Sequence, residues 1–122
     1  LHIKEDIDAA IQQVLESTAF IQGPQVNIFA DELASYTNAL AVIPCANGTD
    51  ALQIAMMALG LKPGDEVILP VHTYVATAEV IALLGLTPVF AEVHADTFNL
   101  DVTQLENKIT ARTKAIVPVH LY

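Results

Sequence analysis

Four short apolar runs alternate with segments of helical periodicity, and this alternation limits the folds that the chain can adopt. The apolar runs cover residues 40–45, 66–69, 89–93 and 115–120. They are close to continuous and do not alternate apolar with polar residues, which is typical of strands covered on both faces. Strands joined by helices favour a parallel sheet, because a parallel connection has to cross over that sheet. The sequence therefore predicts an α/β fold, with a mostly parallel sheet flanked by helices.

The segments between and before these runs carry helix signals. Apolar residues at helical spacing predict helices over residues 1–18, 26–36, 50–59, 75–84 and 102–109. Gly60 and Gly85 follow two of these helices at the position of a C-terminal cap. The first predicted helix is amphipathic, with isoleucines on one side and charged residues between them.

A tight loop joins the first apolar run to the helix that follows it. The loop contains Asn47, Gly48, Thr49 and Asp50. Thr49 and Asp50 are good N-cap residue types, and Gly48 allows a ligand to approach the backbone closely. Free N–H groups and the helix dipole make such a helix start suitable for an anion. The loop therefore predicts a phosphate site, although an Asn-Gly-Thr turn with a helix cap also occurs without a ligand.

Ligands of parallel α/β sheets bind at the carboxyl ends of the strands. The corresponding segments here are residues 46–50, 70–74, 94–96 and 120–122. Tyr74 could lie against a flat phosphorylated ligand, or it could be a packed core aromatic. His72 and His120 end strands, so each is either close to a site or a polar residue at a sheet edge. The histidines have no metal-ligand spacing, and no Ser-His-Asp arrangement is evident.

Composition excludes several partners. The formal net charge is −9 and no basic patch exists, so neither nucleic acid nor an anionic membrane is expected to bind. The single cysteine, Cys45, is expected in the core and rules out an internal disulfide. The apolar region over residues 67–93 is interrupted by Pro70, Glu79 and Pro88, so we do not expect it to span a membrane. No signal peptide is visible, so a cytoplasmic location is expected.

Three stretches of the sequence resemble one known family. They are FIQGPQV from Phe20, ANGTDALQIAMMALGLKPGDEVILPVHTYVATAEVIALLGLTPVFAEVHADTFNLD from Ala46, and ITARTKAIVPVHLY from Ile109. Together they resemble the DegT/DnrJ/EryC1/StrS family of sugar aminotransferases, which use pyridoxal 5′-phosphate (PLP). The resemblance implies the aspartate-aminotransferase architecture, PLP fold type I. Residues 1–122 would form the N-terminal part of its PLP-binding large domain, with N-terminal helices over 1–36 and βα units over 37–122.

The resemblance also assigns roles to residues. Gly48, Thr49 and Asp50 match the loop that holds the PLP phosphate, and Tyr74 matches the aromatic residue that stacks on the cofactor ring. His120 matches a family motif without an assigned role. The family's acidic partner of the pyridinium nitrogen and its Schiff-base lysine would lie beyond Tyr122. No catalytic residue is therefore expected within this chain, and we expect the 122-residue piece alone to be inactive.

The implied reaction moves an amino group from glutamate to a keto group of a nucleotide-linked sugar, in a homodimer. One alternative is a sugar dehydratase of the same family, in which histidine replaces the lysine. Others are a non-catalytic binding or regulatory relative and an α/β domain without PLP. In relatives, the strand matching residues 40–45 pairs with a later strand that this chain lacks. We therefore expect the piece to need further chain, or a partner, for stable folding.

Overall fold

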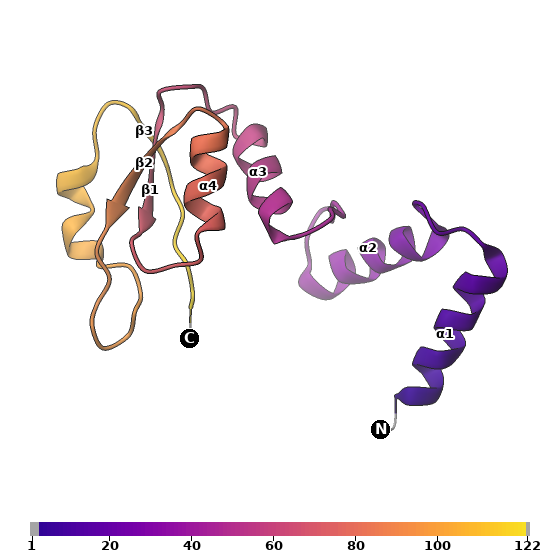
Figure 1. Ribbon diagram of the computed structural model, residues 1–122. Helices are drawn as coiled ribbons and strands as arrows, with labels where there is room; N and C mark the ends of the chain where they lie inside the picture. Colours follow the sequence, from indigo (N-terminus) through magenta and orange to yellow (C-terminus); the bar gives the residue numbers. More distant parts are fainter. Residues whose placement is uncertain (1–2, 122) are drawn as a thin grey trace. The chain divides into compact units, whose positions relative to one another are not determined.

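The computed structural model describes residues 3–121, and they form two compact units. One unit ends at Pro44 and the other begins at Cys45. The elements are α1 Lys4–Ser17, α2 Pro24–Thr37, α3 Gly48–Ala58, β1 Glu66–Pro70, α4 Ala76–Leu83, β2 Thr87–Ala91, the 3-10 turns η1 Val102–Gln104 and η2 Glu106–Lys108, and β3 Thr113–Ile116 (Figure 1).

The first unit contains the two predicted N-terminal helices. Helix α2 starts at Pro24, two residues before the predicted position, because proline has no N–H and suits the first turn of a helix. Neither α1 nor α2 contains a buried residue. The isoleucines of the predicted apolar stripe, Ile7 and Ile11, are about half exposed. The amphipathic pattern is thus confirmed as a helix whose apolar side is open within the described chain.

The predicted strand over residues 40–45 is wrong for this chain, because the segment is irregular. No strand of the described residues pairs with it, and a strand needs a neighbour to satisfy its N–H and C=O groups. Leu40 is 104% exposed and Ile43 is 72% exposed. Cys45 is also exposed, so its expected core position is wrong.

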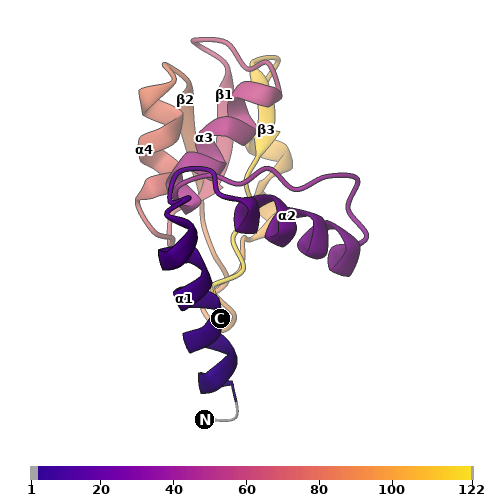
Figure 2. The same ribbon diagram turned by 90° about the vertical axis from the view of Figure 1, so that its right-hand side faces the viewer.

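The second unit is built on a parallel sheet with the strand order β2-β1-β3. The α/β prediction is confirmed, with three strands formed of the four expected. The central strand β1 is fully buried. Val67 and Leu69 face a core that includes Met56 of α3 and Ile81 of α4, whereas Ile68 faces Leu100 on the other side. Figure 2 shows α3 and α4 in front of the same face of the sheet.

Several element bounds differ from the sequence predictions. Strand β2 starts two residues before the predicted 89–93. The predicted helix over 102–109 is two separate 3-10 turns. Strand β3 ends at Ile116 and does not reach His120, because β1 ends at Pro70, which has no N–H. Gly60 and Gly85 do follow their helices as predicted, with φ of +69° and +71°.

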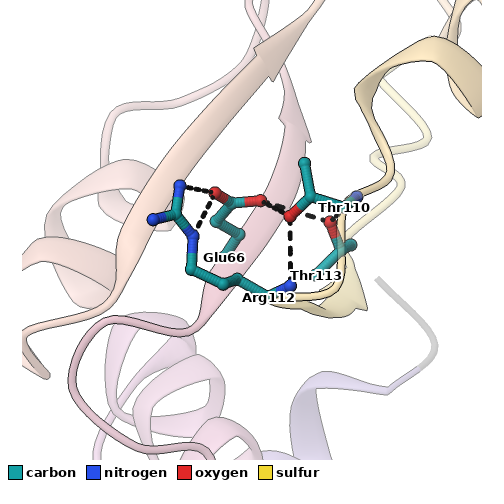
Figure 3. A network of polar contacts seen from close by, with 4 residues as sticks. All are labelled: Glu66, Thr110, Arg112 and Thr113. Carbon is teal, nitrogen blue, oxygen red and sulfur yellow. Dashed lines mark hydrogen bonds and ion pairs between the residues drawn. The ribbon is translucent and has the colours of Figure 1, made fainter.

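A polar network joins the start of β3 to the start of β1 (Figure 3). The Glu66 side chain is 5% exposed and accepts hydrogen bonds from Thr110 Oγ1 at 2.6 Å and Arg112 Nε at 2.9 Å. The hydrogen bond from Thr110, followed by that from Arg112, lowers the pKa of Glu66. Sequence reasoning missed this network, because its residues lie 44 and 46 positions apart.

Candidate functional site

A cavity of about 570 Å³ lies in the second unit, at the carboxyl ends of β1 and β3. Three segments form it, namely the start of α3, the connection from β1 into α4, and the chain that follows β3. Its lining residues are Gly48, Thr49, Leu52, Thr73, Tyr74, Ala76, Thr77, Val117, Pro118, Val119 and His120. The volume falls within the range of about 300–1,000 Å³ typical of small-molecule sites.

The start of α3 is capped by Asn47, and this corrects the prediction that Thr49 or Asp50 forms the cap. Asn47 Oδ1 accepts a hydrogen bond from the Asp50 N–H at 2.9 Å, and Asn47 Nδ2 donates to Asp50 Oδ2 at 3.1 Å. The first N–H groups of a helix have no acceptor within the helix. Since Asn47 satisfies only the N–H of Asp50, those of Gly48 and Thr49 remain available at the cavity wall.

Gly48 leaves space beside these N–H groups. A Cβ atom added at Gly48 would meet no atom within 4 Å. Glycine is therefore not required here by packing within the chain, and the space beside it is open to a ligand. Two free N–H groups, the Thr49 hydroxyl and the positive end of the α3 dipole suit an anionic group such as a phosphate.

Tyr74 lies in the connection between β1 and α4 and lines the same cavity. Its side chain is not packed in the core, because the residue is 76% exposed. The core-aromatic interpretation of Tyr74 is therefore wrong. An exposed ring at a cavity wall offers an apolar face to a flat ligand.

Other candidate residues lie outside this cavity. The Asp50 side chain pairs with Asn47 and does not line the cavity. The end of β2 contributes nothing to the lining, and His94 Nε2 lies 3.6 Å from Asp101 Oδ1. Hydrogen bonds from the hydroxyl and the backbone N–H of Thr103 lower the pKa of Asp101. The ring of His72 lies 5.3 Å from that of Phe98, and the predicted segment 120–122 extends beyond the described residues at 122.

The sequence analysis did not single out Thr73 and Thr77, which contribute hydroxyl groups near Tyr74. Thr73 lies before α4 and Thr77 lies in its first turn, so helical spacing does not relate them and the local sequence carries no signal that both line the cavity. Among residues 3–121, no group of histidine, cysteine, aspartate and glutamate could hold a metal ion. No helix of the described part is long and apolar enough to cross a membrane.

The fold is that of an α/β protein with a cavity at the carboxyl ends of parallel strands. The DegT/DnrJ/EryC1/StrS aminotransferase family matches the chain over residues 1–122. The chain belongs to this family, as the sequence resemblance predicts.

Individual relatives agree with this assignment. The UDP-2-acetamido-2-deoxy-3-oxo-D-glucuronate aminotransferase of Pseudomonas aeruginosa is 58% identical over 98% of this chain. The crystal structure of S. venezuelae DesV in complex with a ketimine intermediate has a TM-score of 0.93 and 43% identity over 99% of the chain. The structure of NtdA from Bacillus subtilis with bound cofactor PMP has a TM-score of 0.91 and 39% identity over 96% of the chain.

The chain spans a third or less of these relatives, namely 33%, 33% and 27% of their lengths in the same order. Its α/β fold is part of the PLP type I aminotransferase fold of these structural neighbours, which confirms the predicted fold class. The residues at the cavity fit a pyridoxal phosphate group. They offer free N–H groups and a hydroxyl for its phosphate, open space at Gly48, and an exposed ring for its pyridine.

Proposed function

We propose that this chain forms the phosphate-binding and ring-binding part of the active site of a PLP-dependent sugar aminotransferase. The observation that carries the proposal is that Gly48, Thr49 and Tyr74, which come from two separate segments, line the same cavity. Family membership supports the reaction class, and one structural neighbour holds PMP. The chain as a whole would then be the N-terminal part of a PLP-binding large domain, with helices over 1–36 and βα units over 37–122.

Each residue has a distinct task in this proposal. The Gly48 and Thr49 N–H groups and the Thr49 hydroxyl bind the phosphate and fix one end of the cofactor. Asp50 acts through Asn47, because their reciprocal hydrogen bonds hold the first turn of α3 in place. Tyr74 would hold the pyridine ring of the cofactor by contact with its own exposed ring. When bound, PLP supplies the electron sink for amino-group transfer.

The substrates follow from the most similar relative named above, whose name specifies a UDP-linked 3-oxo sugar acid. We propose that the complete protein carries an amino group from glutamate to a nucleotide-linked keto sugar and acts as a homodimer in the cytoplasm. The exposed thiol of Cys45 is compatible with a reducing compartment. The Schiff-base lysine would lie in the part of the family's length that this chain does not cover, so the 122-residue chain alone would not transfer amino groups.

The direct test is the first half of the reaction in the complete protein that carries this chain. We expect glutamate to convert bound PLP to pyridoxamine phosphate. The change in the absorbance of the cofactor measures this conversion. Thr49→Val should weaken PLP binding about ten- to a hundredfold, because it removes one hydrogen bond to a charged phosphate. Equilibrium dialysis measures this affinity.

The matched control is Thr87→Val, which changes an exposed threonine at the start of β2, outside the cavity lining. The control should bind PLP as the unmodified protein does. Equal PLP affinity in the Thr49 and Thr87 variants would contradict the phosphate assignment. Absence of amino transfer together with loss of water from the sugar would indicate the dehydratase reaction instead.

A further inference from the structure

We propose that His120 binds the pyridine part of the ligand held in this cavity, through a hydrogen bond from or to its imidazole. The inference rests on the proposed function and adds a third contact to the phosphate and ring contacts given above. His120 lines the cavity together with Thr49 and Tyr74, although it is 71 and 46 positions away from them in the sequence.

The backbone before His120 is held in place. The Val117 N–H donates to the Ile68 carbonyl of the central strand at 2.8 Å. Pro118 then restricts the backbone, since its ring fixes φ. Val117 and Val119 are half-buried, whereas His120 is exposed. The imidazole therefore extends from a fixed segment and is not part of the core.

The imidazole is also free for a ligand. Within residues 3–121 it makes no hydrogen bond and no ion pair, in contrast to His94, which lies beside Asp101. Apart from Tyr74, His120 is the one titratable side chain in the cavity lining, the other members being aliphatic residues, threonines and a glycine. A histidine ring can both donate and accept a hydrogen bond, so it suits the ring substituents of a pyridine.

The segments that line the cavity differ in chemistry, and this difference assigns His120 to the ring end of the ligand. The start of α3 supplies the N–H groups and the hydroxyl that suit a phosphate, and these groups belong to one segment. A cavity of about 570 Å³ is larger than a phosphate group fills. The third segment, which carries His120, therefore contacts the remainder of the ligand.

The test measures binding to the complete protein and not turnover. We expect His120→Ala to weaken the binding of pyridoxamine phosphate about three- to tenfold, the effect of losing one hydrogen bond. It should leave the affinity for inorganic phosphate, measured by competition, unchanged. His120→Gln keeps a donor and an acceptor and should restore most of the affinity. The absorbance maximum of the bound cofactor should differ between His120→Ala and the unmodified protein, and His120→Gln should bring it back toward that of the unmodified protein.

The matched control is His94→Ala, which removes an exposed histidine outside the cavity lining. Equal pyridoxamine phosphate affinity in the His120 and His94 variants would overturn the inference while leaving the proposed function intact. Equal loss of phosphate and pyridoxamine phosphate affinity would also overturn it, because His120 would then act at the phosphate. Failure of the unmodified protein to bind pyridoxamine phosphate would overturn the proposed function, and this inference with it.

Discussion

At the scale of single residues, the choice of helix cap decides which backbone groups a ligand can reach. Asn47, Thr49 and Asp50 are all common cap residues, so the local sequence alone does not select among them. The structure selects Asn47, whose side chain accepts from the Asp50 N–H. The Thr49 side chain thereby remains at the cavity wall, where its hydroxyl adds to two free N–H groups.

Tyr74 carries the prediction that belongs to this scale. Tyr74→Ala should weaken PLP binding about two- to tenfold, because an aromatic contact contributes about 0.5–1.5 kcal/mol. Tyr74→Phe should retain the affinity. Since Tyr74 is 76% exposed, the thermal unfolding midpoint should stay unchanged in both variants.

Tyr36→Ala is the comparison for this experiment, since Tyr36 is exposed on α2 and outside the cavity lining. Affinity is measured by fluorescence titration with PLP. A Tyr74→Ala protein that binds PLP as tightly as the Tyr36→Ala protein would exclude the ring contact.

At the scale of elements, a charged group lies where β1 and β3 begin, at the end of the sheet opposite the cavity. Glu66 pairs with Thr113, and the register then shifts so that Val67 pairs with Ala115. Lys114 is thus the additional residue of a bulge. At this irregular end of the sheet, the Glu66 carboxylate accepts hydrogen bonds from Thr110 and Arg112, which precede β3.

This network predicts a pH dependence of stability. The folded-state pKa of Glu66 lies below its ordinary value of 4.5, chiefly through the Thr110 hydrogen bond and then the Arg112 hydrogen bond. Between these two pKa values, the unfolded chain binds more protons than the folded chain does. The contribution of Glu66 to the free energy of unfolding is therefore fully present above about pH 4.5. It is lost as the pH falls through the folded-state pKa of Glu66.

Denaturant unfolding of the complete protein between about pH 3 and pH 7 measures this effect, because this range includes the ordinary pKa of a glutamate side chain. Glu66→Gln should lower the free energy of unfolding at pH 7 and flatten its decline toward acid. Glu92→Gln, which changes an exposed glutamate, should retain the decline. An unchanged acid profile in the Glu66 variant would show that the network does not contribute to stability.

The sequence predicted the elements whose signals are local. Periodicity identified α1 to α4, and Gly60 and Gly85 marked two helix ends correctly, because positive φ favours glycine. The predicted strand over 40–45 failed, because pairing depends on residues far away in the sequence. For the same reason nothing in the local sequence indicates that Glu66 accepts a hydrogen bond from Arg112.

The residues of the cavity also differ in whether the nearby sequence predicts their position at the site. The loop chemistry of Gly48 and Thr49 and the position of Tyr74 after a strand were sufficient to single them out. Asp50 was expected at the site from the resemblance, whereas its carboxylate pairs with Asn47. His120 had a motif but no role, because nothing in the local sequence shows that it shares a cavity with α3.

At the scale of the whole molecule, the described chain leaves apolar surface open. The segment over residues 40–45 has no strand partner, and the helices of the first unit bury no residue. An exposed, unpaired apolar segment is a site at which further chain or a partner can associate. We therefore expect the remainder of the complete protein to cover it.

Hydrogen exchange tests this expectation. In the isolated 122-residue chain, the amides of residues 40–43 should exchange close to the intrinsic rate, and those of Val67, Ile68 and Leu69 in the buried strand β1 should exchange more slowly than these. In the complete protein, the amides of residues 40–43 should become protected. Protection of residues 40–43 already in the isolated chain would contradict this expectation, because the segment would then be ordered without further chain.

The most direct test of the account is a crystal structure of the complete protein with pyridoxamine phosphate. The phosphate oxygens should lie about 2.7–3.2 Å from the N–H nitrogens of Gly48 and Thr49, with the Tyr74 ring against the pyridine. A second cavity of about 390 Å³ lies near the amino ends of the strands and is lined by Lys62 and Lys114. Density for the phosphate in that cavity, with the site at Thr49 empty, would contradict the account.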